Sequence, residues 1–257
     1  MKTLHRNDLK GHISKNQIKF IRQLELKKFR QREGLFVAEG PKVVGDLLDC
    51  GWKPRQLFAT DAWTGQNEAI RVSDDELRKI SFLQHPQQVL ALFPTPHDHS
   101  EAQPSLLESH SSQRLFLALD GIQDPGNLGT IIRIADWFGI ATVFCSYETA
   151  DAWNPKVVQA TMGSIARVKV CYVNMEELLR NTTLPVYGTL LDGDSIYGQQ
   201  LSSEGIIVMG NEGNGISPSV RQLVGHRLLI PAFGRGAESL NVAIATAIVC
   251  SEFRRRQ

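Results

Sequence analysis

The feature of this 257-residue chain that most constrains its fold is a series of short, continuously apolar runs in its second half. The runs are Leu115–Leu119, Ile140–Cys145, Val168–Tyr172, Val186–Leu191, Ile206–Met209 and Leu228–Ile230. Helical stretches separate them. Strands that are apolar throughout and alternate with helices are typical of a parallel sheet covered on both faces. The second half therefore predicts an α/β domain built on a parallel sheet.

The first half predicts a smaller α/β domain. Ser14 and Gln17 have the form of a capping box, and apolar residues then recur at helical spacing, which predicts one helix up to Gly34. A further helix is expected to begin at Pro41. Strand-like runs lie at Leu35–Ala38, Gln56–Thr60 and Val89–Phe93, and the first two flank this helix, so a βαβ arrangement is expected. The stretch 94–113 is rich in Pro, Ser and His, so we expect domains at 1–104 and 114–257 joined by a linker at 105–113.

Composition narrows the class of protein. No stretch approaches the roughly 18 apolar residues of a membrane span, and the N-terminal residues lack the apolar segment of a signal peptide, so we expect a cytoplasmic protein. The four cysteines lack metal-site spacing, and we interpret them as reduced core thiols without a metal. They are Cys50, Cys145, Cys171 and Cys250. We interpret His97 and His99 as part of a loop.

Charge is distributed unevenly along the chain. The net charge is +1, yet residues 1–32 hold ten Lys or Arg against two acidic residues. A basic helix of this kind is typical either of a phosphate-binding surface or of a solvated face, and charge alone leaves both open. The candidate RNA-contacting residues are Lys19, Arg22, Lys27, Lys28, Arg30 and Arg32. Arg254–Arg256 could likewise contact RNA or stabilise a helix C-terminus.

Three glycine-rich segments follow strands of the second domain, where open α/β sheets bind ligands. In DGIQDPGNLGTIIRIADWF, Asn127 is expected to cap a helix, and Arg133 projects from a face other than the buried stripe. The second segment is MGNEGNGISP, in which glycines let backbone approach a ligand. The third, IPAFGRGAESLNVAIATAIV, leads into a helix that is apolar on nearly all sides, which suggests a second subunit against it.

Within these segments, NLGTIIRIAD, VMGNEGNGIS and IPAFGRGAESLNVAIATAI resemble the three signature motifs of the SpoU/TrmH family of RNA 2′-O-methyltransferases. FVAEGPKVV resembles the small substrate-binding domain that precedes the catalytic domain in many members. The resemblance implies a C-terminal SPOUT domain whose parallel sheet carries a trefoil knot, preceded by a small α/β substrate-binding domain. It also implies S-adenosylmethionine as cofactor, a homodimer, and ribosomal or transfer RNA as substrate.

The resemblance implies site residues as well. The catalytic cluster would comprise Asn127, Arg133, Glu212, Ser239 and Asn241. The cofactor would contact Leu190, Gly210, Glu212, Ile230 and Leu240. Arg133 is proposed in the family as general base, but a guanidinium keeps its proton, and clamping a phosphate is the alternative role. The sequence leaves the choice open.

Two other functions remain as alternatives. A dinucleotide-dependent enzyme would need a G-x-G-x-x-G pattern after its first strand, and no segment has one. A non-catalytic RNA-binding relative would be expected to lack Asn127, Arg133 or Asn241, and all three are present. The sequence does not indicate which RNA, nucleotide or base is modified.

Overall fold

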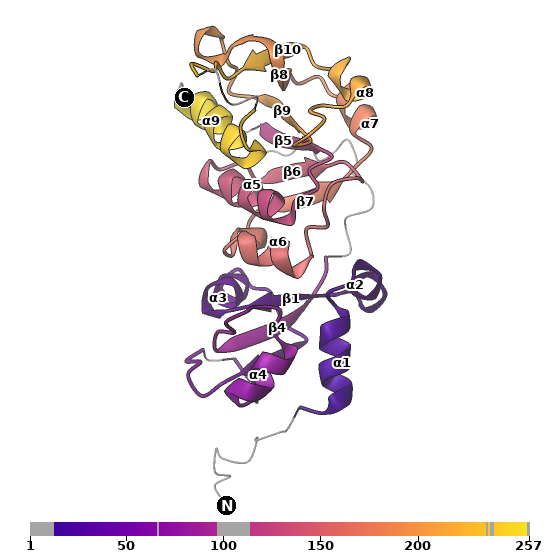
Figure 1. Cartoon of the computed structure of the whole chain (residues 1–257), viewed down its shortest axis with the longest axis vertical. Coiled ribbons are helices and arrows are strands. Elements are labelled where there is room, and N and C mark those ends of the chain that lie inside the picture. Colours follow the sequence, from indigo (N-terminus) through magenta and orange to yellow (C-terminus); the bar gives the residue numbers. More distant parts are fainter. Residues whose placement is uncertain (1–12, 66, 97–113, 235, 237–238, 256–257) are drawn as a thin grey trace, which may run out of the picture. The chain divides into compact units, whose positions relative to one another are not determined.

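The computed structural model describes residues 13–65, 67–96, 114–234, 236 and 239–255 (Figure 1). The predicted linker 105–113, His97, His99 and Arg256 lie outside these residues. The chain divides into two compact units, one of Met1–Pro96 with Trp153–Ala166 and one of His97–Ala152 with Arg167–Gln257. Trp153–Ala166 was expected in the second domain, and the structure instead packs this segment with the first unit. No helix of the described residues is long and apolar enough to cross a membrane.

The second unit is built on a six-stranded sheet, as predicted. Its strands are β5 (Leu115–Asp120), β6 (Thr142–Cys145), β7 (Lys169–Tyr172), β8 (Val186–Ser195), β9 (Gly205–Gly210) and β10 (His226–Leu229). They lie in the order β10-β8-β9-β5-β6-β7, and every neighbouring pair is parallel. The parallel sheet confirms the prediction. Strands β5, β6 and β9 are buried along nearly their whole length, whereas β10 and the second half of β8 are largely exposed.

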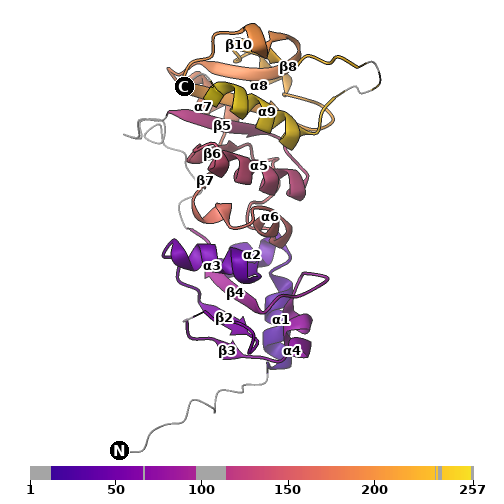
Figure 2. The same ribbon diagram turned by 90° about the vertical axis from the view of Figure 1, so that its left-hand side faces the viewer.

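Helices cover both faces of this sheet. They are α5 (Pro125–Trp137), α7 (Met175–Arg180), α8 (Pro218–Arg221) and α9 (Val242–Arg255), with a short 3-10 helix η3 (Ile196–Gly198). Helices α5 and α9 lie side by side on one face, and α7 and α8 lie on the other (Figures 1 and 2). Although α9 follows β10 at one edge of the sheet, it packs on α5 and contacts β9. The chain therefore returns from the edge strand to the middle of the sheet before it ends.

The first unit has a four-stranded sheet. Its strands are β1 (Leu35–Glu39), β2 (Gln56–Ala59), β3 (Ile70–Arg71) and β4 (Val89–Pro94). The order is β1-β4-β2-β3, and β4 is antiparallel to both β1 and β2. The predicted βαβ connection between β1 and β2 is present, but β4 is inserted between the two strands. The short strand β3 was not predicted, because two residues carry no periodicity.

Six helical segments complete the first unit. They are α1 (Lys15–Gln23), α2 (Lys27–Glu33), α3 (Pro41–Asp49), α4 (Asp74–Ile80), α6 (Pro155–Ala160) and the 3-10 helix η2 (Ser164–Ala166). The capping box at Ser14 and Gln17 is present, with hydrogen bonds of 3.0 and 3.2 Å. Pro41 stands at the start of α3, as predicted.

The prediction of one helix up to Gly34 is wrong, because the helix breaks between α1 and α2. The Arg30 side chain is only 3% exposed and donates hydrogen bonds of 2.7 Å to the carbonyls of Leu24 and Glu25. These carbonyls lie at the break, where the helix no longer satisfies them. The apolar spacing continues across the break, since Leu24 stays buried, and the sequence pattern therefore missed it.

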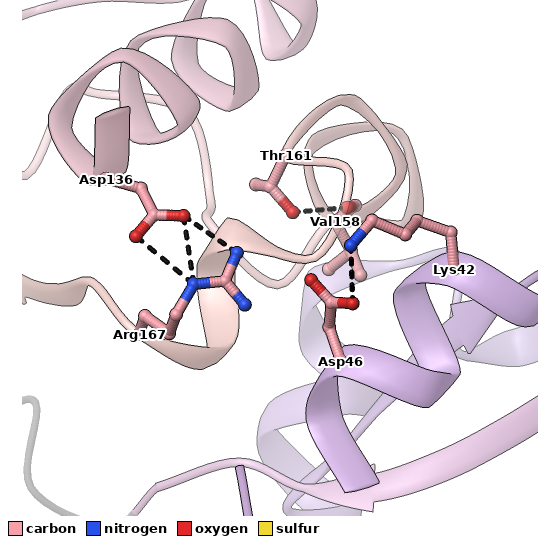
Figure 3. A network of polar contacts seen from close by, with 6 residues as sticks. All are labelled: Lys42, Asp46, Asp136, Val158, Thr161 and Arg167. Atoms are coloured by element: carbon pink, nitrogen blue, oxygen red, sulfur yellow. Dashed lines mark hydrogen bonds and ion pairs between the residues drawn. The ribbon is translucent and has the colours of Figure 1, made fainter. Parts of the chain in front are cut away.

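Aromatic packing and the close approach of Gly163 to Asp46 hold Trp153–Ala166 in the first unit. The Trp153 ring packs on Phe36 with centroids 4.6 Å apart, and Trp52 lies 6.2 Å from Trp153. Figure 3 shows Asp46 of α3, which is paired with Lys42 at 2.6 Å. A Cβ added at Gly163, whose φ is +96°, would lie 2.4 Å from the Asp46 carboxylate. Glycine is therefore required at that position.

Candidate active site

The start of α5 positions the first polar side chain of the site. Asp124 is the N-cap, and its carboxylate accepts a 2.7 Å hydrogen bond from the backbone N–H of Asn127. The prediction that Asn127 caps this helix is wrong, because Asp124 takes that role and Pro125 occupies the first helical position. The Asn127 side chain is consequently free for other contacts.

Asn127 joins two segments that lie far from it in the sequence. Its Nδ2 donates to Glu212 Oε1 at 3.0 Å, and its Oδ1 accepts from Asn241 Nδ2 at 2.9 Å. Asn241 Oδ1 in turn accepts from the backbone N–H groups of Ala243 and Ile244 at the start of α9. Those N–H groups fix which end of the Asn241 amide faces Asn127, and hence which end of Asn127 faces the carboxylate. We call Asn127, Glu212 and Asn241 the polar cluster.

The turn that carries Glu212 is hydrogen-bonded to the residue that follows β5. Asn211 Nδ2 donates to the Gly121 carbonyl at 2.7 Å, and Asn211 Oδ1 accepts from the N–H groups of Gly213 and Asn214 at 2.9 and 3.0 Å. These bonds hold the loop on both sides of Glu212. The backbone that carries Glu212 is therefore held in place, and the exposed carboxylate is oriented by its hydrogen bond from Asn127.

Gly210 precedes this turn and serves the fold. A Cβ at this position would lie 2.2 Å from the carbonyl carbon of Gly215 and from the nitrogen of Ile216. The contact between the Gly210 backbone and the cofactor, which the resemblance implies, stays a prediction. A larger residue there would disrupt the loop itself.

A cavity of about 420 Å³ lies beside the polar cluster. Its lining comes from the middle of β8, from the end of β10 with the segment that follows it, and from the start of α9 with the residues just before it. The lining residues are Thr189, Leu190, Leu191, Leu228, Leu229, Ile230, Pro231, Ala232, Phe233, Gly234, Ser239, Leu240 and Ala245. None of them carries a charge. Its size and apolar lining are typical of a site for a cofactor-sized molecule.

The structure divides the expected site residues between these two features. Leu190, Ile230, Leu240 and Ser239 line the cavity, and Leu240 is 50% exposed. The other two expected cofactor contacts, Gly210 and Glu212, are not among the described residues that line the cavity. Ser239 and Leu240 directly precede Asn241, so one short segment joins the cavity to the polar cluster.

Arg133 does not join the polar cluster. It lies six residues after Asn127 on α5, about 240° around the helix, and its side chain is exposed. Within the described part of the chain it has no hydrogen bond or ion pair. The exposed guanidinium is therefore available to an outside partner.

The expected RNA-contacting residues fall into two groups. Lys19, Lys27 and Lys28 are exposed. Arg22 and Arg32 are exposed as well, but these two and Arg30 make hydrogen bonds or ion pairs within the chain. Arg22 hydrogen-bonds to the Ser81 carbonyl, Arg32 pairs with Glu33 at 2.8 Å, and Arg30 is buried. The expectation that Arg30 contacts RNA is corrected, because its guanidinium is held inside the fold.

The possible metal ligands, the cysteines and Arg254 are further candidates for a functional role in the sequence. The structure describes no group of three or more His, Cys, Asp or Glu side chains that could hold a metal ion. Burial raises the pKa of the Cys145 thiol and raises that of Cys250 to about 12. Cys50 is exposed, which corrects the prediction that it lies in the core. Arg254 donates to the Phe138 carbonyl at 2.8 Å and so satisfies the end of α5.

Two residues that shape the site, Asp124 and Asn211, were not predicted from the sequence. Asp124 carries the signal of a helix N-cap followed by Pro, but Asn127 was taken for the cap instead. Asn211 was passed over because its partner Gly121 lies 90 positions earlier, and a single sequence does not show such a contact.

Comparison with known proteins matches a separate family model to each half of the chain. The model of the SpoU rRNA Methylase family matches residues 114–251. The model of the MRM3-like substrate binding domain matches residues 15–91. A curated relative, the 23S rRNA (guanosine(2553)-2′-O)-methyltransferase RlmP of Bacillus subtilis, is 31% identical over 94% of this chain and 97% of its own.

Solved structures extend this likeness to the whole fold. A Porphyromonas gingivalis protein assigned to the TrmH family of RNA methyltransferases is 44% identical, with a TM-score of 0.83 over 96% of this chain and 100% of the other. An AdoMet-bound rRNA methyltransferase from Sinorhizobium meliloti is 33% identical, with a TM-score of 0.81 over 93% of this chain and 94% of the other. Both similarities span the two units.

Proposed function

The chain belongs to the SpoU rRNA methylase family, and from this premise we propose that it transfers a methyl group from S-adenosylmethionine to a ribose 2′-hydroxyl of ribosomal or transfer RNA. The observation that carries this proposal is the segment Ser239–Asn241, which joins an apolar cavity to a polar cluster. A cofactor in the cavity and a ribose at the cluster would be neighbours. Such proximity is what an in-line transfer requires.

The cavity fits S-adenosylmethionine in size and chemistry. Leu190, Ile230 and Leu240 would enclose the cofactor, and its volume of about 420 Å³ lies in the range of cofactor sites. When bound, the cofactor supplies a methyl group on a sulfonium, which is a good leaving group. Binding of AdoMet by the related Sinorhizobium meliloti enzyme supports the assignment.

The polar cluster would orient the ribose. Asparagine amides do not gain or lose protons near neutral pH, so Asn127 and Asn241 act by hydrogen bonding. Asn241 orients Asn127, and Asn127 in turn donates to the Glu212 carboxylate, which can accept a further hydrogen bond. Ser239, at the edge of the cavity, offers a further hydroxyl. Arg133 would clamp a phosphate next to the reacting ribose.

The first unit would hold the RNA. Its match to the MRM3-like substrate binding domain and the exposed Lys19, Lys27 and Lys28 support this role. Replacing these three lysines by Gln should weaken RNA binding. It should also lower the salt slope on a duplex by roughly 0.9 for each phosphate that a lysine no longer neutralises. An unchanged slope would mean that the lysines form a solvated face only.

We further propose a homodimer, a trefoil knot and a cytoplasmic location. Trp137 on α5 is 85% exposed and Ile244 on α9 is 54% exposed, which supports a homodimer formed through these neighbouring helices. Sedimentation velocity of the wild type and of Ile244→Glu tests it.

The return of the chain from β10 to α9 supports a trefoil knot, which an experimental structure traced through this region tests. We place the protein in the cytoplasm, which cell fractionation tests.

Incubation of the purified chain with radiolabelled S-adenosylmethionine and RNA tests the function. We expect label in RNA, in dinucleotides that resist alkaline hydrolysis, because a 2′-O-methyl group removes the attacking hydroxyl. Asn127→Ala should retain cofactor affinity and lose most transfer. Cofactor binding without transfer to any RNA would favour the non-catalytic RNA-binding alternative.

A further inference from the structure

A tight turn after β6 presents two exposed side chains of complementary chemistry. The turn is closed by a hydrogen bond of 3.0 Å from the Thr149 N–H to the Ser146 carbonyl. Ser146 and Thr149 are buried, at 4% and 3% exposure. Between them, Tyr147 is 60% exposed and Glu148 is exposed. An aromatic ring and a carboxylate therefore occupy the two corners of the turn.

Hydrogen bonds fix this turn to the end of β5. The Ser146 N–H and the Thr149 hydroxyl both donate to the Leu119 carbonyl, at 2.9 and 3.1 Å. The Gly121 N–H donates to the Ser146 hydroxyl at 3.0 Å. Ser146 and Thr149, which flank the two corner residues, are thus both fixed by hydrogen bonds. The backbone of Tyr147 and Glu148 is therefore held at the surface.

The turn lies at the same edge of the sheet as the polar cluster. Strands β5 and β6 are parallel neighbours with Leu119 opposite Cys145, so the turn begins one residue beyond that pair. The segment that leaves β5 reaches Glu212, whose carboxylate accepts from the Gln123 N–H at 3.5 Å. A nucleotide whose ribose sits at the polar cluster could thus extend its base toward the turn.

We propose that Tyr147 and Glu148 form a subsite for the base of the methylated nucleotide and that this base is guanine. This inference rests on the proposed function. The Tyr147 ring would stack on the base, as exposed aromatic rings do with unpaired bases of RNA. The Glu148 carboxylate would accept hydrogen bonds from the N1–H and 2-amino groups, which guanine presents side by side. A carboxylate repels phosphate, so this corner selects a base edge and not the RNA backbone.

The test uses the RNA fragment around the nucleotide that the labelling experiment identifies, synthesised with guanosine or with inosine at that position. Tyr147→Ala should raise the KM for RNA by roughly 5- to 100-fold, the range that base–aromatic stacking supports, with unchanged S-adenosylmethionine affinity. Tyr147→Phe should recover most of the loss, because it keeps the ring. Inosine lacks the 2-amino group, so the wild type should prefer guanosine and Glu148→Gln should lose most of that preference.

Controls separate the inference from the function on which it rests. Tyr197→Ala removes another exposed tyrosine, 50% exposed in η3, and should leave the KM for RNA unchanged. A wild type that methylates RNA while Tyr147→Ala keeps the same KM would overturn the inference alone. The same holds if the identified nucleotide is not guanosine. A wild type that transfers no methyl group to RNA would overturn both.

Discussion

Arg133 carries a permanent positive charge on an exposed part of α5, and the described residues offer it no partner. We therefore expect Arg133→Ala to lose most methyl transfer while S-adenosylmethionine affinity stays within a few fold. Arg133→Lys should also be poor, because a lysine cannot make the bidentate contact to a phosphate. Steady-state kinetics and calorimetric titration of the cofactor decide this. Near-normal turnover of the Lys variant would argue against a bidentate clamp.

Glu39, buried in β1, gives the first unit a pH dependence. Burial raises the pKa of its carboxyl above the ordinary value of 4.5, although Ser81 and the Phe82 N–H donate to it. The folded state then binds the proton more tightly than the unfolded state. The unfolding free energy should therefore fall as pH rises from the unfolded pKa through the folded one.

Glu39→Gln tests this effect, because glutamine keeps an acceptor for the Phe82 N–H and can donate to the Ser81 hydroxyl. The variant should gain stability relative to the wild type as pH rises from about 4 to about 7. Urea unfolding followed by tryptophan fluorescence at several pH values measures the difference. A difference that stays constant over this range would contradict the assigned pKa direction.

Single residues were predicted from sequence with uneven success. The sequence motifs named Asn127, Glu212 and Asn241, and the structure brings these three together by hydrogen bonds. The motif also named Gly210, where an added Cβ would meet the backbone of Gly215 and Ile216. The packing explains why a glycine stands there, and the contact of its backbone with the cofactor stays a prediction.

At the level of elements, the cap of α5 links stability to the site. Asp124→Ala removes the acceptor for the Asn127 N–H and should lower the unfolding free energy by about 1 kcal/mol. It should also slow transfer, because Asn127 would be less well placed. Asp124→Asn keeps a capping side chain and should lose much less. Denaturant unfolding and turnover, measured on both variants, test this, and equal stability of the Ala and Asn variants would exclude a capping role.

Elements were predictable where local pattern and tertiary packing agree. Strands β5, β6 and β9 of the second unit were found because a strand buried from both faces is apolar along its length, and the other three because each contains a short apolar run. The break between α1 and α2 was missed because it depends on Arg30, whose contacts reach back five and six residues to free carbonyls. The order of β1, β4 and β2 was also beyond reach, since nothing local specifies which strand lies in the middle.

At the scale of the whole molecule, the two units are not two continuous pieces of sequence. Sequence composition predicted a cut near residues 105–113, but Trp153–Ala166 packs with the first unit. Deleting residues 1–104 would remove Phe36 from the Trp153 ring and Asp46 from Gly163. We therefore expect the truncated chain to be less stable than the second unit of the intact protein. Its melting temperature, compared with that of the full chain, tests this, and an unchanged value for the second unit would contradict it.

The central claim is that this chain methylates a ribose 2′-hydroxyl of RNA. The most direct measurement maps 2′-O-methylation across all stable RNAs in cells that contain the protein, in cells that lack it, and in cells that carry only the Asn127→Ala variant. We predict one or a few nucleotides of ribosomal or transfer RNA that lose the modification both without the protein and with the variant. Identical maps in all three cell types, together with no transfer to RNA by the purified protein, would contradict the claim.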